Sequence, residues 1–212
     1  MFRDRRDAGE QLATLLGDYR ARHDAVLLAI PRGGVPVASE MAHALALPLD
    51  ILSVHKIGAP REPELAIGAV AEDGPVELDE DAIAAMHISE AELQSAIVRE
   101  RAELLRRERV YRVYCGDRPP LALTGQVVIL VDDGLATGYT MLAAIHAVRR
   151  RGASRIVIAV PVAPQDTLDR LRYEADDMFC VYTPRSLMAV GQFYEDFSQV
   201  RDERVARAVA DS

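Results

Sequence analysis

Short runs of consecutive apolar residues alternate along this chain with helical patterns, and few folds can accommodate that alternation. The runs predict strands that are covered on both faces, because they are uninterrupted rather than alternately apolar and polar. They are residues 25–30, 49–57, 126–131, 155–162 and 177–182. The segments between them predict helices over 4–21, 35–47, 138–151 and 164–174. We therefore expect an α/β fold, a Rossmann-like parallel sheet flanked by helices.

One segment, residues 67–114, interrupts the simple alternation of strands and helices. Its pattern predicts strands over 67–71 and 75–78, a hairpin turn at Asp73-Gly74 and a long charged helix over 89–114. A Gly- and Pro-containing linker follows at 115–125. At 212 residues the chain is long enough for about one domain. We expect a single domain over 1–212, with a cap or insert of hairpin and helix at about 67–125.

Composition and charge exclude several classes of protein. The formal net charge is -8, which argues against a chain whose main partner is nucleic acid. No apolar stretch approaches the roughly 18 residues of a membrane span, and the N-terminal residues lack the apolar run of a signal peptide. The two cysteines, Cys115 and Cys180, form neither a disulfide framework nor a zinc motif. We therefore expect a cytoplasmic protein without a membrane or nucleic-acid partner.

The segment after the strand at 126–131 carries the most specific chemistry. Two adjacent carboxylates, Asp132 and Asp133, precede a loop of glycine, small and hydroxyl residues that leads into a helix. Backbone N–H groups of such a loop and of the helix N-terminus bind phosphate, and Thr137 and Thr140 add hydroxyl donors. Carboxylates repel phosphate unless a sugar separates the two. The pattern therefore predicts a sugar phosphate whose hydroxyl groups, or a Mg²⁺ ion bound to them, contact the carboxylates.

This segment resembles the phosphoribosyl-pyrophosphate (PRPP) signature of the type I phosphoribosyltransferases. The resemblance implies that Asp132 and Asp133 contact the ribose hydroxyls and hold Mg²⁺ directly or through those hydroxyls and water. It also implies that the loop after them binds the 5′-phosphate. The residues of that loop are Gly134, Leu135, Ala136, Thr137, Gly138, Tyr139 and Thr140.

Two further loops extend the resemblance. Arg32, Gly33 and Gly34 follow a strand and precede a helix, as in the family's pyrophosphate loop. Lys56 is the only lysine of the chain and matches a basic residue that touches pyrophosphate in the family. It precedes residues 58–66, which resemble the family's flexible catalytic loop. Arg61 in that loop is expected to close over the site and stabilise the charge of the leaving group.

The resemblance implies a Mg²⁺-dependent enzyme that transfers the phosphoribosyl group of PRPP to a nitrogen nucleophile, a nucleobase or small amine. Ala136 replaces an aspartate that the purine-salvage branch usually carries, which disfavours a 6-oxopurine acceptor. Phe193 or Tyr194, after the last strand, could stack on an acceptor base. The alternative is a regulatory protein that binds PRPP or a nucleotide without turnover; a sugar-phosphate hydrolase would need a base for water, which no motif supplies. Relatives commonly dimerise, so a homodimer is expected.

Overall fold

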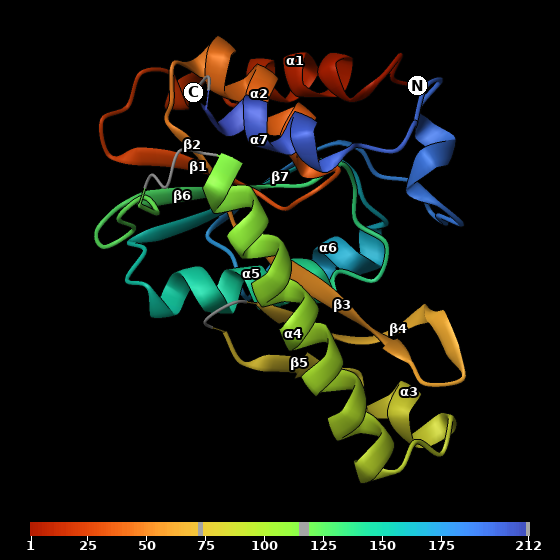
Figure 1. The fold of residues 1–212 in the computed structure, drawn as a ribbon. Helices are drawn as coiled ribbons and strands as arrows, with labels where there is room; N and C mark the ends of the chain where they lie inside the picture. The colour runs from red at the N-terminus through yellow and green to blue at the C-terminus, as the bar shows by residue number, and fades with distance from the viewer. Residues whose placement is uncertain (72–73, 115–118, 211–212) are drawn as a thin grey trace.

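A five-stranded sheet forms the centre of the computed structural model, which describes residues 1–71, 74–114 and 119–210 (Figure 1). Its strand order is β2–β1–β6–β7–β8, and all neighbouring strands are parallel. The strands are β1 (Ala25–Ala29), β2 (Leu49–Ile51), β6 (Val127–Val131), β7 (Arg155–Val162) and β8 (Asp177–Tyr182). The predicted parallel α/β sheet is confirmed.

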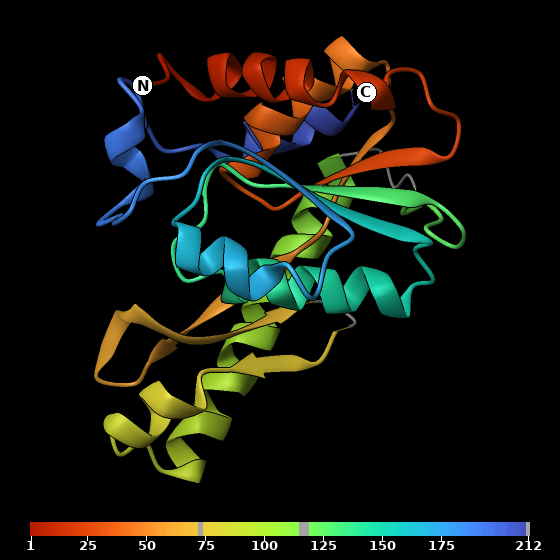
Figure 2. The ribbon, with the colours of Figure 1, turned by 180° about the vertical axis from the view of Figure 1, so that it is seen from behind.

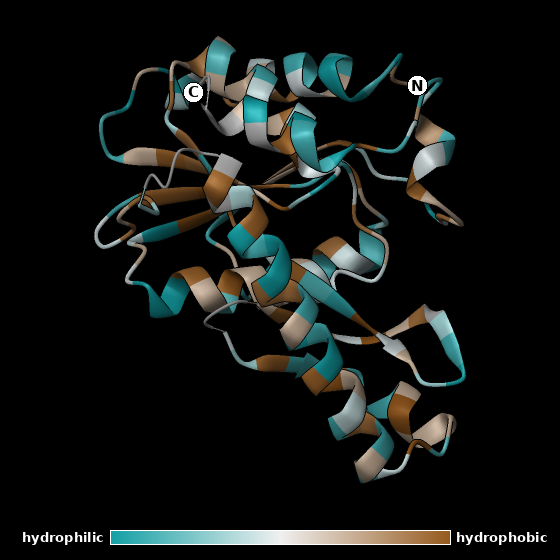
Figure 3. Ribbon diagram, viewed as in Figure 1, coloured by the Kyte–Doolittle hydropathy of each residue, from teal (hydrophilic) through white to brown (hydrophobic). Residues whose placement is uncertain are grey.

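Helices cover both faces of this sheet, as Figures 1 and 2 show from opposite sides. One layer contains α1 (Arg5–Leu15), α2 (Gly34–Leu45) and α7 (Asp202–Ala210), and the other contains α5 (Tyr139–Arg150) and α6 (Gln165–Leu171). Successive residues of β1 enter opposite cores: Leu27 packs with the first layer and Leu28 with the second. Figure 3 shows hydrophobic residues along the central strands and mixed character along the flanking helices.

A second, antiparallel sheet projects from this core. It has the order β3–β4–β5, with β3 (Val54–Ala59), β4 (Glu62–Ala71) and β5 (Val76–Leu78). The short helix α3 (Glu80–Ala85) and the long helix α4 (Glu90–Tyr114) follow. The sheet has a core of its own with α4, a buried cluster that includes Ile57 and Ile67 of the sheet and Leu104 of the helix. In Figure 1, α4 runs from the far end of this unit back towards the main sheet. The predicted helix over 89–114 is confirmed.

The prediction of a single strand over 49–57 is wrong. The chain turns at Leu52 and Ser53, so β2 joins the parallel sheet while β3 starts the antiparallel one. Both turn residues are buried, and Ser53 Oγ donates a hydrogen bond to Glu108 Oε2 at 2.5 Å. A change of direction inside the protein leaves the apolar run unbroken, which is why the pattern did not reveal it.

The loop predicted over 58–66 is largely a strand pair. Strands β3 and β4 continue to Ala59 and restart at Glu62, which leaves a short turn between them. Gly58 permits the close approach of the Pro63 carbonyl, where a side-chain carbon would collide with it. The pairing shifts register on either side of Gly58, so the proline is accommodated at an irregularity.

Smaller differences concern the ends of the chain and the linkers. The helix predicted over 4–21 ends at Leu15, and a 3₁₀ turn, η1 (Gly17–Tyr19), follows it. Asp73 of the predicted turn and residues 115–118 of the predicted linker lie outside the described residues. The single-domain interpretation with a cap or insert stays a prediction. Among the described residues, no helix combines the length and the apolar character that crossing a membrane requires.

Candidate functional site

The loops that follow β1 and β6 lie side by side, because the two strands are paired in register from Ala25 with Val127 to Ala29 with Val131. Gly33 and Gly34 make this approach possible. A side-chain carbon at position 33 would collide with the Asp133 carboxylate, and one at position 34 would lie 2.5 Å from the Val131 carbonyl oxygen. The peptide bond between Pro31 and Arg32 is cis. The predicted pyrophosphate loop therefore contacts the predicted acidic pair directly.

Asp133 is held by an arginine from the start of the chain. Arg5 Nε donates to Asp133 Oδ2 at 2.7 Å, and Arg5 Nη2 lies 2.7 Å from the same oxygen. The two side chains are 11% and 14% exposed, respectively. Tyr194 Oη donates to the Asp133 carbonyl oxygen at 2.6 Å, so both the side chain and the backbone of Asp133 are fixed.

The two carboxylates differ in their electrostatic environment. Burial raises the pKa of Asp132, and the neighbouring charge of Asp133 raises it further. Burial also raises the pKa of Asp133, although the Arg5 guanidinium counteracts this rise. The Asp133 backbone N–H donates to Asp132 Oδ1 at 2.8 Å. Two adjacent buried carboxylates attract hydroxyl donors or a cation.

The donor set fits Mg²⁺ together with a ligand that supplies further oxygens. Mg²⁺ in proteins is usually held by one or two carboxylates, several waters and substrate phosphates rather than by a complete protein cage. Within residues 1–71, 74–114 and 119–210, no cluster of three or more His, Cys, Asp and Glu side chains is suited to a metal ion. Asp132 and Asp133 do not form such a cluster, so an ion at this pair would need further oxygens from a ligand or from water.

A cavity of about 320 Å³, named here the loop cavity, opens beside Asp132. Its lining comes from β3, β4, the loop after β6 and the segment after β8: Lys56, Leu65, Ala66, Asp132, Gly134, Leu135, Ala136, Thr137, Gly138, Thr140 and Val190. The structure thus brings Lys56 to the predicted phosphate loop from a different sheet. Gly138 has φ +77° at the start of α5, a backbone angle that glycine adopts without strain.

Residues of α6 (Gln165–Leu171) contact the predicted phosphate loop from outside. Thr167 Oγ1 of α6 donates to the Ala136 carbonyl oxygen at 2.8 Å. The Tyr139 ring does not line the loop cavity and instead lies 4.8 Å from the Arg170 guanidinium. Burial and a hydrogen bond to Asp79 raise the pKa of Tyr139. The Tyr139 side chain is therefore directed away from the loop cavity.

A second cavity of about 340 Å³, the arginine cavity, lies on the Asp133 side of the acidic pair. It is lined by Arg5, Arg32, Gly33, Asp133, Phe197, Gln199 and Val200. Arg32 also lies 3.9 Å from Asp202 of α7. Most of the predicted site residues therefore line one of two cavities, with Asp132 in the loop cavity and Asp133 in the arginine cavity.

Arg61 lines neither of these two cavities, which is also true of Gly34 and Tyr139. It lies in the turn between β3 and β4, its side chain is 67% exposed, and its Nη2 is 3.2 Å from Glu92 Oε1. Hydrogen bonds from Ser89 and Arg61 lower the pKa of Glu92 to about 2. In this structure the turn is directed to the start of α4.

Sequence reasoning missed Arg5 and Phe197. The Arg5 guanidinium carbon lies 3.9 Å from the centroid of the Phe197 ring, and both residues contact the arginine cavity. No motif distinguishes either residue from the many arginines and the aromatic tail around it. Tyr194, considered as a stacking residue for an acceptor, is buried under Asp133 and between the rings of Phe2 and Phe197.

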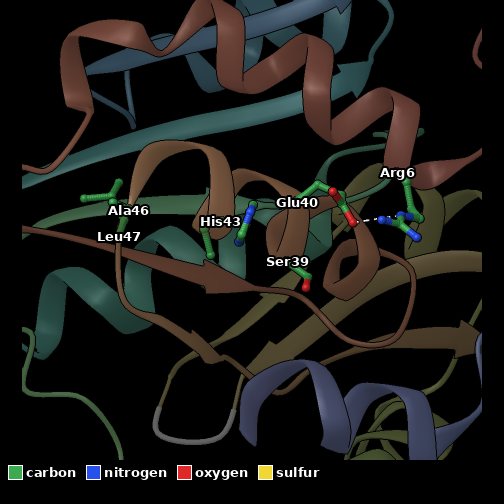
Figure 4. Close-up of a pocket in the computed structure, with 7 residues that line it drawn as sticks. Arg6, Ser39, Glu40, His43, Ala46 and Leu47 are labelled. Carbon is green, nitrogen blue, oxygen red and sulfur yellow. Dashed lines mark ion pairs between the residues drawn. The ribbon is translucent and has the colours of Figure 1, made fainter. Parts of the chain in front are cut away.

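A larger cavity of about 510 Å³ lies away from these loops. It is lined by Arg6 of α1 and by residues of α2 and the segment just after it: Ser39, Glu40, Ala42, His43, Ala46 and Leu47. Figure 4 shows the ion pair at one end of this cavity, where Arg6 Nε lies 2.8 Å from Glu40 Oε1. None of the predicted site residues lines it, so size alone does not identify the functional site.

Comparisons with known proteins identify the family that this chain matches. Residues 6–196 match the family model described as a phosphoribosyl transferase domain. The chain is 42% identical over 205 residues to a Mycobacterium tuberculosis (strain H37Rv) protein named "Putative phosphoribosyl transferase Rv0571c". The alignment covers 97% of this chain and 45% of the relative, so the chain spans less than half the length of that protein.

Solved structures are also similar. The crystal structure of the protein TT1426 from Thermus thermophilus has a TM-score of 0.79 and 40% sequence identity, over 99% of this chain and 98% of that one. A hypothetical protein from Neisseria gonorrhoeae, solved with bound ppGpp, has a TM-score of 0.50 and 13% identity, over 98% of this chain and 91% of that one. The second similarity concerns the fold alone.

Proposed function

Because this chain belongs to the phosphoribosyltransferase family, we propose that it transfers the 5-phosphoribosyl group of PRPP to a nitrogen nucleophile and releases pyrophosphate. The family supports a glycosyltransferase-type enzyme, whereas the donor and acceptor are the proposed part. One observation carries the proposal. Asp132 lines the loop cavity together with a phosphate-binding type of loop, and its neighbour Asp133 lines the arginine cavity together with Gly33.

The residues around the acidic pair suit the two ends of PRPP. The proposed 5′-phosphate site is the loop over 134–140, most of whose residues line the loop cavity at the start of α5. Asp132 and Asp133 are the proposed partners of the ribose hydroxyls. The proposed pyrophosphate contacts are Arg32, Gly33, Gly34 and Lys56. When bound, Mg²⁺ would offset the negative charge of pyrophosphate and so favour its departure.

The proposed chemistry depends on position and charge. The bond from ribose C1 to the pyrophosphate oxygen breaks, a bond from C1 to the acceptor nitrogen forms, and that nitrogen loses a proton. The transition state is oxocarbenium-like, so carboxylates beside the ribose and cations beside pyrophosphate both stabilise the developing charges. The protein orients the two reactants and excludes water. The proposed role of Arg61 is to leave Glu92 and cover the site when the turn closes.

The acceptor is proposed to be a nucleobase or small amine other than a 6-oxopurine. Ala136 lines the loop cavity and brings no carboxylate to the position where the purine-salvage branch usually has an aspartate. The alternative function, binding of PRPP without turnover, is favoured by one observation: Arg61 pairs with Glu92 outside both cavities. A homodimer also stays a prediction.

Calorimetry of PRPP binding tests the proposal directly. Wild-type protein is expected to bind PRPP with Mg²⁺ and to bind it at least about tenfold more weakly without the ion. The double variant Asp132→Asn/Asp133→Asn is expected to lose this binding, because it removes both negative charges. Asp18→Asn, an exposed position just beyond the C-terminal end of α1, is the control and is expected to bind as the wild type does.

The outcomes separate the two functions. Binding followed by pyrophosphate release in a screen of nitrogen acceptors supports transfer, and binding without release supports the regulatory alternative. Release of free ribose phosphate without an acceptor would indicate hydrolysis. If wild-type protein binds no PRPP with or without Mg²⁺, the proposal is wrong.

A further inference from the structure

Arg5 is held in place by the paired ends of the chain. Asp4 Oδ1 accepts hydrogen bonds from the backbone N–H groups of Arg6 and Asp7, both at 2.9 Å, and so fixes the first turn of α1. Just before it, Phe2 is fully buried, and its backbone pairs with Phe193 and Glu195 at 2.8 and 2.9 Å. The N-terminal residues thus pair with the segment after β8, and Arg5 lies next to the acidic pair.

All three nitrogens of the Arg5 guanidinium and one of its faces have contacts. Nε and Nη2 both lie 2.7 Å from Asp133 Oδ2, and Nη1 donates to the Ser198 carbonyl oxygen at 2.9 Å. The Phe197 ring covers one face, with 3.9 Å between the guanidinium carbon and the ring centroid. This combination of a forked hydrogen bond and ring stacking requires the planar guanidinium of arginine.

The neighbouring arginines, Arg3 and Arg6, are exposed, whereas Arg5 is largely buried. The Arg3 side chain is 72% exposed and pairs with Asp7, and that of Arg6 is 60% exposed and pairs with Glu40. A buried ion pair such as Arg5–Asp133 contributes little net stability, because the cost of removing both charges from water offsets their attraction. Its consequence is therefore geometric: it determines where the Asp133 carboxylate lies.

We propose that Arg5 is a positioning residue of the PRPP site. It holds the Asp133 carboxylate against the Gly33 loop, in the arginine cavity, and leaves Asp132 as the carboxylate that lines the loop cavity. Arg5 acts through Asp133. The inference rests on the proposed function, because it concerns how the same acidic pair receives PRPP.

Calorimetry of PRPP binding in the presence of Mg²⁺ tests this role. Arg5→Met is expected to bind at least about tenfold more weakly than the wild type, because Asp133 loses the contact that orients it. Arg5→Lys is expected to bind PRPP with an affinity between those of the wild type and Arg5→Met, since an ammonium group keeps the charge but lacks the planar pair of donors. Arg3→Met is the matched control and is expected to bind as the wild type does.

A double-mutant cycle separates positioning from packing. Asp133→Asn is expected to weaken binding but to leave it measurable at high protein concentration, because the amide oxygen still accepts hydrogen bonds. Arg5→Met/Asp133→Asn is expected to bind no more weakly than Asp133→Asn alone. If the losses in PRPP binding free energy of the two single variants add in the double variant instead, Arg5 acts independently of Asp133 and the inference is overturned.

The remaining outcomes are also decisive. If wild-type protein binds PRPP and Arg5→Met binds equally well, the inference fails and the proposed function stands. If wild-type protein does not bind, the proposed function fails and the positioning role fails with it. Should Arg5→Met not fold, Phe197→Leu supplies the test, since it removes the ring under the guanidinium and keeps both charges. It is expected to weaken binding about threefold in the wild-type background and not in the Asp133→Asn background.

Discussion

At the scale of single residues, the contact between Gly33 and Asp133 couples the two loops of the candidate site. Gly33 has φ −64° and ψ −37°, a helical backbone conformation that alanine also adopts readily. A methyl group at this position would nevertheless overlap the Asp133 carboxylate. Glycine is therefore needed here for space rather than for backbone freedom.

Gly33→Ala is consequently expected to displace Asp133 and to weaken PRPP binding by at least about tenfold. Such overpacking typically costs about 1–3 kcal/mol of stability. Calorimetric titration and thermal unfolding measure the two effects. Gly17→Ala is the control, because a side-chain carbon there has nothing within 4 Å. Unchanged PRPP binding by Gly33→Ala would show that the collision is relieved without moving Asp133.

The residue scale also explains which parts of the candidate site were predictable. Asp132, Asp133 and the loop after them stand together in the sequence, so their spacing after a strand was readable. Arg5 contacts Asp133 from 128 positions away, and Phe197 reaches Arg5 from the other end of the chain. Such pairs are formed by tertiary packing, and one sequence carries no periodic signal for them.

At the scale of elements, the same argument explains what the strand predictions captured. Runs such as 127–131 and 155–162 were readable because a central parallel strand is buried on both faces. The turn between β2 and β3 was not readable from the sequence, because Leu52 and Ser53 are themselves buried. The strands over 58–66 were hidden by glycine and two prolines, which mark a loop in most contexts.

The Ser53–Glu108 hydrogen bond links this buried turn to α4, and Ser53→Ala tests its importance. Ser53 is 3% and Glu108 is 7% exposed, so the variant removes a hydrogen bond from a buried carboxylate. The free energy of unfolding is expected to fall by about 1–3 kcal/mol, as measured by urea denaturation. Ser154→Ala, which removes an exposed hydrogen bond to the Gln126 carbonyl, is expected to change it by about 0.5 kcal/mol or less. Equal effects would show that the turn depends on packing alone.

At the scale of the whole molecule, the antiparallel unit is joined to the parallel core beside α5. Figure 2 shows β5 below α5, and His146 of α5 links the two parts. Its Nδ1 lies 2.6 Å from Glu77 of β5, and its Nε2 lies 3.2 Å from Glu174, just after α6. Lys56 and Leu65 belong to the same antiparallel unit, so the loop cavity depends on how this unit sits against the core.

Protonation of His146 is expected to strengthen this junction. Burial of the ring lowers its pKa, but the hydrogen bonds to Glu77 and Glu174 outweigh that effect, and the pKa is raised above its usual 6.5. A group with a raised pKa in the folded state binds its proton more tightly there than in the unfolded state. The stabilisation is therefore complete below about pH 6.5 and is lost as the pH rises through the folded-state pKa.

The comparison of wild type with His146→Gln between pH 5.5 and 9 measures this effect. The wild type is expected to have the higher Tm by about 1–3 °C at the acidic end, because the imidazolium pairs with two partly exposed carboxylates. The difference is expected to shrink at alkaline pH, where a neutral imidazole and an amide make similar hydrogen bonds. His23→Gln, at an exposed position before β1, controls for the loss of a histidine elsewhere. A Tm difference that stays constant across this range would show that the junction is held by packing between the two sheets rather than by the charge of His146.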